Sequence, residues 1–293
     1  MRISHLRKPH PGFLTTSLFC LIGVLILVPG KNASALTGAD VALYDDSIAP
    51  SGYRGAWQDG VTALKYMLTY LGYSYEVITY NDLNSSAQNF STLYKTILFP
   101  GGYAQWYNYW INKFGKTRIR NFVYQGGNYV GICAGAYFAS DKIVWEGVTY
   151  DDNVDYNAYG ELTGYDLDLF AGTGTGPMNG IADWDTVGYE MTTLNFNNSG
   201  TISFSEDILY YGGPYFTPDS GAVVRTVATY SYNGASAIVS SPYGSGKVLL
   251  IGPHPEIEED SARDGVTISR EDSLDDNGSD WTMMWYLLRA FAN

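Results

Sequence analysis

Residues 128–135 read Asn-Tyr-Val-Gly-Ile-Cys-Ala-Gly, and this stretch decides the fold. Residues 128–132 form a short, mostly apolar run of the kind that makes a buried strand. Gly131 and Gly135 flank Cys133, and the small residues that follow can open a helix. This strand, turn and helix order is the setting of a nucleophile elbow, in which flanking glycines relieve crowding around one strained residue.

Cys133 has two competing interpretations at this point. At a helix N-terminus, free N–H groups and the helix dipole favour a thiolate, which predicts a nucleophile. The pattern Gly-x-Cys-x-Gly is also short, and a cysteine within it can simply pack in the core. The motif alone leaves both interpretations open.

Strands alternate with helices on the N-terminal side of this stretch. Apolar runs predict strands at residues 39–44, 75–78 and 96–99, and periodic apolar positions predict helices at about 57–71 and 111–124. This alternation is typical of βαβ units. We therefore predict an α/β fold with a mostly parallel sheet and helices on both faces.

The composition and the hydrophobic pattern of the sequence change beyond residue 150. Short alternating runs, such as 201–204 and 222–232, predict antiparallel strands between glycine-rich and aspartate-rich turns. An apolar strand at 248–251 and a C-terminal helix then return to the earlier pattern. We predict one domain over residues 36–293, in which a β-rich insertion interrupts the α/β core.

The first 35 residues have the pattern of a cleavable signal peptide. A basic head precedes an apolar run from Phe13 to Val28, and Pro29-Gly30 breaks that run ahead of Ala33-Ser34-Ala35. The alternative is an uncleaved anchor, but this run is shorter than the roughly 20 residues that a spanning helix needs. We expect cleavage after Ala35, export to the periplasm or the medium, and no membrane span afterwards.

Removal of the first 35 residues leaves an acidic chain with one cysteine and one histidine. The whole chain has a formal net charge of −13, and the removed segment carries four basic and no acidic residues, which leaves −17. This charge argues against a phosphate-binding surface, so we expect no nucleic-acid partner. With only Cys133 and His254 remaining, an internal disulfide is impossible and a metal site would depend on carboxylates, so we expect no metal and no cofactor.

His254 follows the predicted strand at 248–251, in the run Gly-Pro-His-Pro-Glu. Pro255 disfavours helical geometry at His254, and residues two apart in an extended run point to the same side, so Glu256 can reach the imidazole. The alternative is a surface histidine beside an acidic loop. Because Cys133 also follows a buried strand, at the edge where open parallel sheets place their sites, we predict a triad of Cys133, His254 and Glu256.

Acyl transfer also needs donors for the developing oxyanion. Pro100-Gly101-Gly102 directly follows the predicted strand at 96–99 and presents backbone N–H groups without side chains in the way. The N–H of Ala134 is the usual second donor after an elbow nucleophile. Glycine pairs also make ordinary turns, so the sequence leaves open whether Gly101 or Gly102 donates.

The three motifs, taken in chain order, resemble the class I glutamine amidotransferase superfamily. They are Pro-Gly-Gly at 100–102, Gly-Ile-Cys-Ala-Gly at 131–135 and His-Pro-Glu at 254–256. The resemblance spans about residues 40–292. It implies a flavodoxin-like core in which the cysteine is the nucleophile, the histidine is the base and the glutamate orients the histidine.

Longer runs resemble the biotin-protein ligase N-terminal-like family more closely. They are Gly-Ile-Cys-Ala-Gly-Ala-Tyr-Phe-Ala-Ser at 131–140, Gly-Pro at 176–177 and Tyr-Gly-Gly-Pro-Tyr-Phe at 211–216. Glutaminases of the superfamily usually have glutamine where this chain has Tyr137, which argues against free glutamine as the substrate. No synthase domain and no biotin-ligase catalytic domain is expected to accompany the domain.

Two hypotheses of function follow. The first is a hydrolase or amidotransferase-like enzyme that attacks a small-molecule or peptide amide, including isopeptides and cell-wall amides, through a thioester on Cys133. The second is a non-catalytic binding module of the same fold. Its pocket would be lined by aromatic residues, namely Tyr103, Trp106, Tyr137 and Tyr215. Tyr137 and Tyr215 are also the candidates for contact with a substrate.

Overall fold

The computed structural model describes residues 35–85, 87–150, 155–156, 158–159, 162–163, 167–186, 188–198, 202–258, 262–266 and 280–292. The predicted signal peptide lies outside the described residues, apart from Ala35. Within the described part of the chain, no helix is both long enough and apolar enough to cross a membrane.

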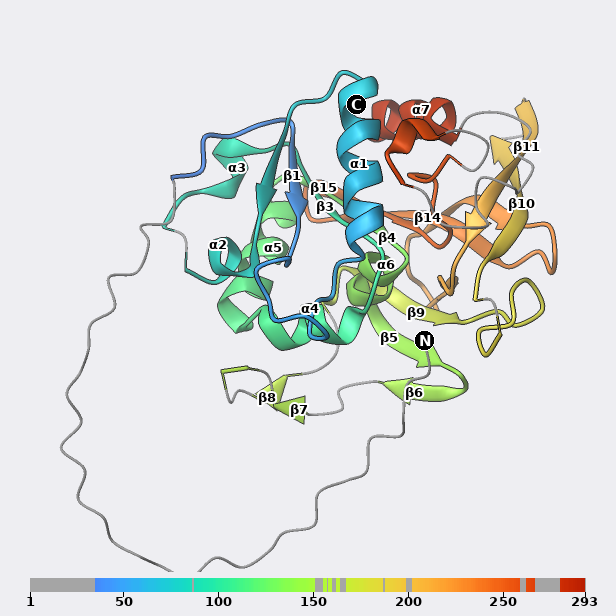
Figure 1. Ribbon diagram of the computed structural model, residues 1–293, viewed down its shortest axis with the longest axis horizontal. Coiled ribbons are helices and arrows are strands. Elements are labelled where there is room, and N and C mark those ends of the chain that lie inside the picture. The colour runs from blue at the N-terminus through green and yellow to red at the C-terminus, as the bar shows by residue number, and fades with distance from the viewer. Residues whose placement is uncertain are drawn as a thin grey trace, which may run out of the picture. The chain divides into compact units, whose positions relative to one another are not determined.

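Five neighbouring parallel strands form the core of the fold (Figure 1). Their spatial order is β2 (Tyr75–Ile78), β1 (Val41–Tyr44), β3 (Thr96–Phe99), β4 (Asn128–Ile132) and β15 (Gly246–Ile251). This is the flavodoxin-like order 2-1-3-4-5, with β15 as the fifth strand. All five strands were predicted to within two residues of their ends, and the predicted α/β class is confirmed.

Helices cover both faces of this parallel sheet (Figure 1). α1 (Gln58–Tyr70) and α7 (Asp280–Ala292) lie on one face and contact each other through the rings of Tyr70 and Trp281, whose centroids are 5.4 Å apart. The other face carries α2 (Tyr80–Ser85), α3 (Phe90–Leu93) and α5 (Lys113–Tyr124). A doubly wound sheet needs both layers because its strands are apolar on both sides.

The β-rich segment continues the sheet beyond β15. In spatial order the added strands are β14 (Ser236–Tyr243), β12 (Tyr215–Pro218), β9 (Phe170–Gly176), β5 (Ser140–Trp145) and β6 (Val148–Tyr150), and a branch contains β13 (Arg225–Tyr230), β10 (Glu190–Asn198) and β11 (Ile202–Tyr210). β14 pairs with β15 in antiparallel fashion, as predicted for this segment. β7 (Asp155–Tyr156) and β8 (Leu162–Thr163) form a separate two-stranded sheet, and η1 (Ala262–Asp264) is a short 3-10 turn.

The helix predicted at about 111–124 is α5 in the structure, and a helix that was not predicted lies before it. α4 (Ala104–Trp110) precedes α5, and the chain between them is extended at Asn112. The side chain of Asn112 accepts hydrogen bonds from the amides of Phe114 and Gly115, both at 3.0 Å, and so caps the start of α5. The apolar periodicity of α5 was recognised, but the helix that follows the Pro-Gly-Gly motif was missed.

We expect Asn112→Ala to lower the free energy of unfolding by about 0.5–2 kcal/mol, because two amides at the start of α5 lose their acceptor. Urea unfolding followed by circular dichroism measures this. Asn112→Ser is the matched control, since a serine hydroxyl can accept the same hydrogen bonds and should lose little. Equal losses in the two variants would contradict a capping role.

Candidate active site

Cys133 occupies a strained turn between β4 and α6 (Ala134–Ala139). Its backbone has φ 47° and ψ −103°, a conformation that residues other than glycine adopt rarely. Its amide donates to the Ile251 carbonyl at 2.8 Å, which ties the turn to the end of β15. A Cβ on Gly131 would lie 2.5 Å from the Gly135 oxygen, and one on Gly135 would lie 2.4 Å from the Phe99 oxygen. Both flanking glycines are therefore required by the close approach of the backbone.

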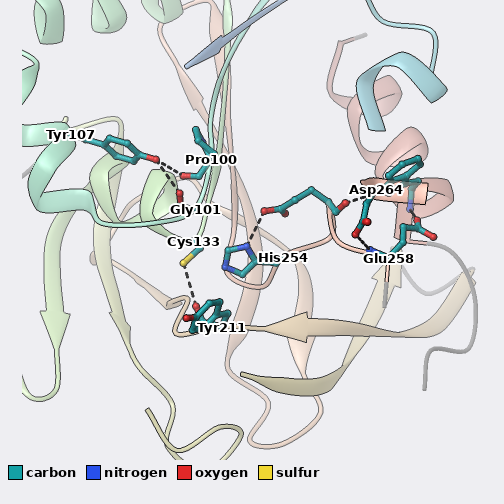
Figure 2. A network of polar contacts seen from close by, with 10 residues as sticks. Pro100, Gly101, Tyr107, Cys133, Tyr211, His254, Glu258 and Asp264 are labelled. Atoms are coloured by element: carbon teal, nitrogen blue, oxygen red, sulfur yellow. Dashed lines mark hydrogen bonds and ion pairs between the residues drawn. The ribbon is translucent and has the colours of Figure 1, made fainter. Parts of the chain in front are cut away.

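The thiol of Cys133 lies in a confined position. The side chain is 5% exposed, and Sγ lies 3.6 Å from the Tyr211 carbonyl, to which the thiol donates a weak hydrogen bond (Figure 2). Tyr211 belongs to the loop between β11 and β12, within the β-rich segment. This segment therefore forms one wall around the sulfur.

His254 and Glu256 form a buried pair at the end of β15. Nδ1 of His254 lies 2.9 Å from Oε1 of Glu256, and the two residues are 1% and 0% exposed. Nε2 has no hydrogen-bond partner among the described residues, and Figure 2 shows the imidazole beside the Cys133 sulfur. In the neutral ring, a proton on Nδ1 that points to the carboxylate leaves Nε2 free to accept one.

Electrostatics favour the protonated form of this histidine. Burial opposes the charge, but the Glu256 carboxylate and the Cys133 sulfur outweigh it and raise the pKa of His254 well above its ordinary value. The arrangement therefore places a protonated imidazole beside the Cys133 sulfur at a buried position.

A buried network holds the loop that carries Glu256. Trp281 of α7 donates from Nε1 to the Glu256 carbonyl at 3.0 Å and from its amide to Glu258 at 3.1 Å. Glu258 also pairs with Arg263, and its amide donates to Asp264 at 3.1 Å (Figure 2). Although this network is acidic, the described residues contain no group of three or more His, Cys, Asp or Glu side chains that could hold a metal ion.

The Pro-Gly-Gly motif forms the opposite wall of the site. Gly102 has φ 134°, and a Cβ there would lie 1.9 Å from the Gly55 oxygen. A Cβ on Gly101 would lie 2.3 Å from Cε1 of His254. Gly101 therefore allows the imidazole to pack against the loop, while Gly102 allows the chain to pair with residues 55–57.

The two tyrosines predicted to contact a substrate lie beside the loop that begins at Tyr211. Tyr137 is buried in α6 and donates its hydroxyl to the Gly212 carbonyl at 3.1 Å, so this hydroxyl already has a partner in the chain. Tyr215 is half-buried at the start of β12 and close enough to interact electrostatically with Tyr137. Of the other two predicted pocket residues, Tyr103 is 48% exposed beside Gly102, and Trp106 packs against Tyr53 with ring centroids 4.9 Å apart.

Five half-buried aromatic residues form a connected group next to the thiol. We call this group the aromatic rim; it consists of Trp57, Trp145, Trp184, Tyr189 and Tyr211. Trp57 contacts the His254 ring at 5.2 Å and the Tyr211 ring at 5.6 Å, and Tyr211 contacts both Trp184 and Tyr189 at 5.6 Å. Trp184 then contacts Trp145 at 5.1 Å.

The sequence did not predict site roles for Trp57 or Trp281. Tyr211 begins the Tyr-Gly-Gly-Pro-Tyr-Phe run, so a motif-level signal was present for that residue. Trp57 and Trp281 lie at the starts of predicted helices, and no local pattern distinguishes them from ordinary core residues.

Comparison with known proteins gives a family match and two curated relatives. Residues 53–280 match the family model described as Biotin-protein ligase, N terminal. An uncharacterized protein of Chlamydia muridarum is 32% identical over 165 residues, which cover 55% of this chain and 60% of that protein. A biotin–protein ligase of Schizosaccharomyces pombe is 28% identical over 171 residues, which cover 57% of this chain and 26% of that protein. The chain thus spans less than two thirds of either relative.

Solved structures are similar at low sequence identity. PurLQS from Thermotoga maritima has a TM-score of 0.49 and 13% identity, and the match covers 85% of this chain and 98% of that chain. A beta-galactosidase from Bacillus circulans sp. alkalophilus has a TM-score of 0.43 and 13% identity, over 74% of this chain and 28% of that chain.

The strained backbone of Cys133 leads to a prediction about the stability of variants at this position. We expect Cys133→Gly to be more stable than Cys133→Ala by about 1 kcal/mol, because glycine adopts a positive φ without steric cost. Urea unfolding of the two variants measures the difference. Ala136→Gly, within α6, is the control and should show the opposite sign, since glycine weakens an ordinary helical position. A Cys133→Gly variant that is less stable than Cys133→Ala would show that the positive φ at residue 133 does not destabilise the folded protein.

Proposed function

The chain belongs to the biotin-protein ligase N-terminal family, and we propose that it is an exported amide hydrolase or amidotransferase-like enzyme with Cys133 as its nucleophile. The observation that carries this proposal is the buried His254–Glu256 hydrogen bond, with the other ring nitrogen open beside the Cys133 thiol. A purely structural histidine would be expected to have both ring nitrogens satisfied when it is this deeply buried.

The proposed reaction proceeds through a thioester. The thiolate of Cys133 attacks the amide carbon, and a new C–S bond forms while the carbonyl oxygen becomes an oxyanion held by backbone amides. His254 gives its proton to the nitrogen as the C–N bond breaks, and the amine leaves. Water then attacks the thioester, His254 takes the water's proton, and the C–S bond breaks to release a carboxylic acid and restore the thiolate.

The site favours an amide other than free glutamine. Tyr137 stands where glutaminases of the superfamily usually have glutamine, and its hydroxyl is bonded to the Gly212 carbonyl. We propose peptides, isopeptides and cell-wall amides as substrates, with the aromatic rim in contact with the apolar part of the molecule. Half-buried tryptophan and tyrosine rings offer large contact areas beside a reactive centre.

A second candidate function is a non-catalytic binding module. The observation that favours it is the 5% exposure of Cys133 together with the five rings of the aromatic rim. In that case the buried pair would stabilise the pocket, and the rings would hold a ligand without turnover.

Alkylation of Cys133 by iodoacetamide tests the nucleophile. Because the pKa of His254 is raised in the folded protein, the imidazolium that favours the thiolate persists at neutral pH and disappears as the pH rises through that pKa. We expect the wild-type protein to keep much of its alkylation rate at pH 6. At pH 6 the alkylation rate of His254→Ala should be at least about tenfold lower, since an ordinary thiol has a pKa of about 8.5.

Glu256→Gln is the graded control, because it keeps the size of the side chain and removes the charge that raises the pKa of His254. At pH 6 its alkylation rate should lie between the rates of the wild-type protein and His254→Ala. At pH 9 all three proteins should react at similar rates. Identical pH profiles in all three proteins would overturn the activated nucleophile and favour the binding module.

Export is tested by the mass of the protein recovered outside the cytoplasm. We expect its first residue to be Leu36, because the small residues that precede it suit signal peptidase. Replacement of Ala35 by a bulky residue, as in Ala35→Trp, should block this cleavage. An exported wild-type protein that still carries residues 1–35 would contradict the predicted cleavage.

A further inference from the structure

The Pro100 and Gly101 carbonyls share one hydrogen-bond donor. The Tyr107 hydroxyl lies 2.9 Å from the Pro100 oxygen and 3.2 Å from the Gly101 oxygen (Figure 2). Each carbonyl also accepts from a backbone amide: Pro100 from Gly135 at 3.1 Å, and Gly101 from Trp57 at 2.8 Å. These bonds join the loop to the Cys133 turn, to α1 and to α4.

These carbonyls determine where the neighbouring amides point. A trans peptide unit is planar, and its C=O and N–H groups point in opposite directions. Fixing the Pro100 oxygen therefore fixes the direction of the Gly101 N–H, and fixing the Gly101 oxygen fixes that of the Gly102 N–H. Glycine has no side chain to restrict its backbone, so at these two residues the orientation depends on such hydrogen bonds.

Tyr107 is itself rigidly held. It is fully buried in α4, and its ring packs edge-on against Tyr44 at 5.2 Å and against Phe99 at 5.4 Å. Gly55 makes room for the ring, since a Cβ there would lie 2.4 Å from it. Burial raises the pKa of Tyr107 well above its ordinary value, so the hydroxyl keeps its proton and donates it.

We propose that Tyr107 is a positioning residue for the oxyanion-binding amides of Gly101 and Gly102, an inference that rests on the proposed function. The hydroxyl does not touch the substrate. It orients the two peptide units, and by donating to their carbonyls it also polarises them, which strengthens the N–H groups as donors to the oxyanion.

Two reactions of Cys133 separate this role from a general structural one. Acylation by p-nitrophenyl acetate forms a C–S bond, develops an oxyanion and releases p-nitrophenolate. Alkylation by iodoacetamide displaces iodide and develops no oxyanion. Loss of the Tyr107 hydroxyl should therefore slow the first reaction and leave the second unchanged.

The test compares Tyr107→Phe with the wild-type protein in both reactions. We expect acylation to slow by about threefold to tenfold, which corresponds to the loss of one hydrogen bond of ordinary strength. The alkylation rate should change by less than about twofold. The variant should remain folded, because each carbonyl keeps its backbone donor. Thermal unfolding and the alkylation rate both check this.

Tyr44→Phe is the matched control. Tyr44 is also fully buried and packs against Tyr107, but its hydroxyl has no hydrogen-bond partner among the described residues. We expect both reactions to be unchanged in this variant. If Tyr107→Phe acylates as fast as the wild type, or if both of its reactions slow equally, the positioning role is refuted. If the wild type alkylates but never acylates, the proposed function fails as well, and both inferences are overturned.

Discussion

The pairing of β4 with β3 on one side and β15 on the other determines where the Pro-Gly-Gly motif, Cys133 and His254 lie. Phe99 pairs with Gly131, and Ile251 pairs with Ile132, so the three strands end at the same level. The loops that follow them carry the Pro-Gly-Gly motif, Cys133 and His254. Parallel strands in register thus bring together three segments that are far apart in the sequence. The hydrogen bond from the Cys133 amide to the Ile251 carbonyl completes this alignment.

The sequence predicted the parts of the site that depend on local pattern. Cys133 between two glycines and the His-Pro-Glu spacing both have a local physical reason, and the structure brings these residues to one edge of the sheet. Tyr107, Trp57 and Tyr211 depend on which helix packs against which loop, and no periodicity encodes that contact. For the same reason the sequence did not predict that β14 would join the β-rich segment to the parallel sheet. It did predict that the segment contains antiparallel strands.

Glycines and buried tyrosines are complementary around this site. Glycine allows the backbone to approach closely but leaves its carbonyls buried, and a buried carbonyl needs a donor. Tyrosine hydroxyls supply those donors: Tyr129 to Gly135 at 2.7 Å, Tyr210 to Gly213 at 2.9 Å and Tyr230 to Pro214 at 3.0 Å. These three bonds give a structural reason for the buried tyrosines that lie beside the glycine-containing loops around Cys133.

The hydrogen bond from Trp281 to the Glu256 carbonyl has a consequence for changes made far from Cys133. The bond spans 25 residues and ties the loop that carries Glu256 to the first turn of α7. Glu256 in turn holds Nδ1 of His254. The orientation of the imidazole therefore depends on how the C-terminal helix packs, as well as on the strand that precedes the loop.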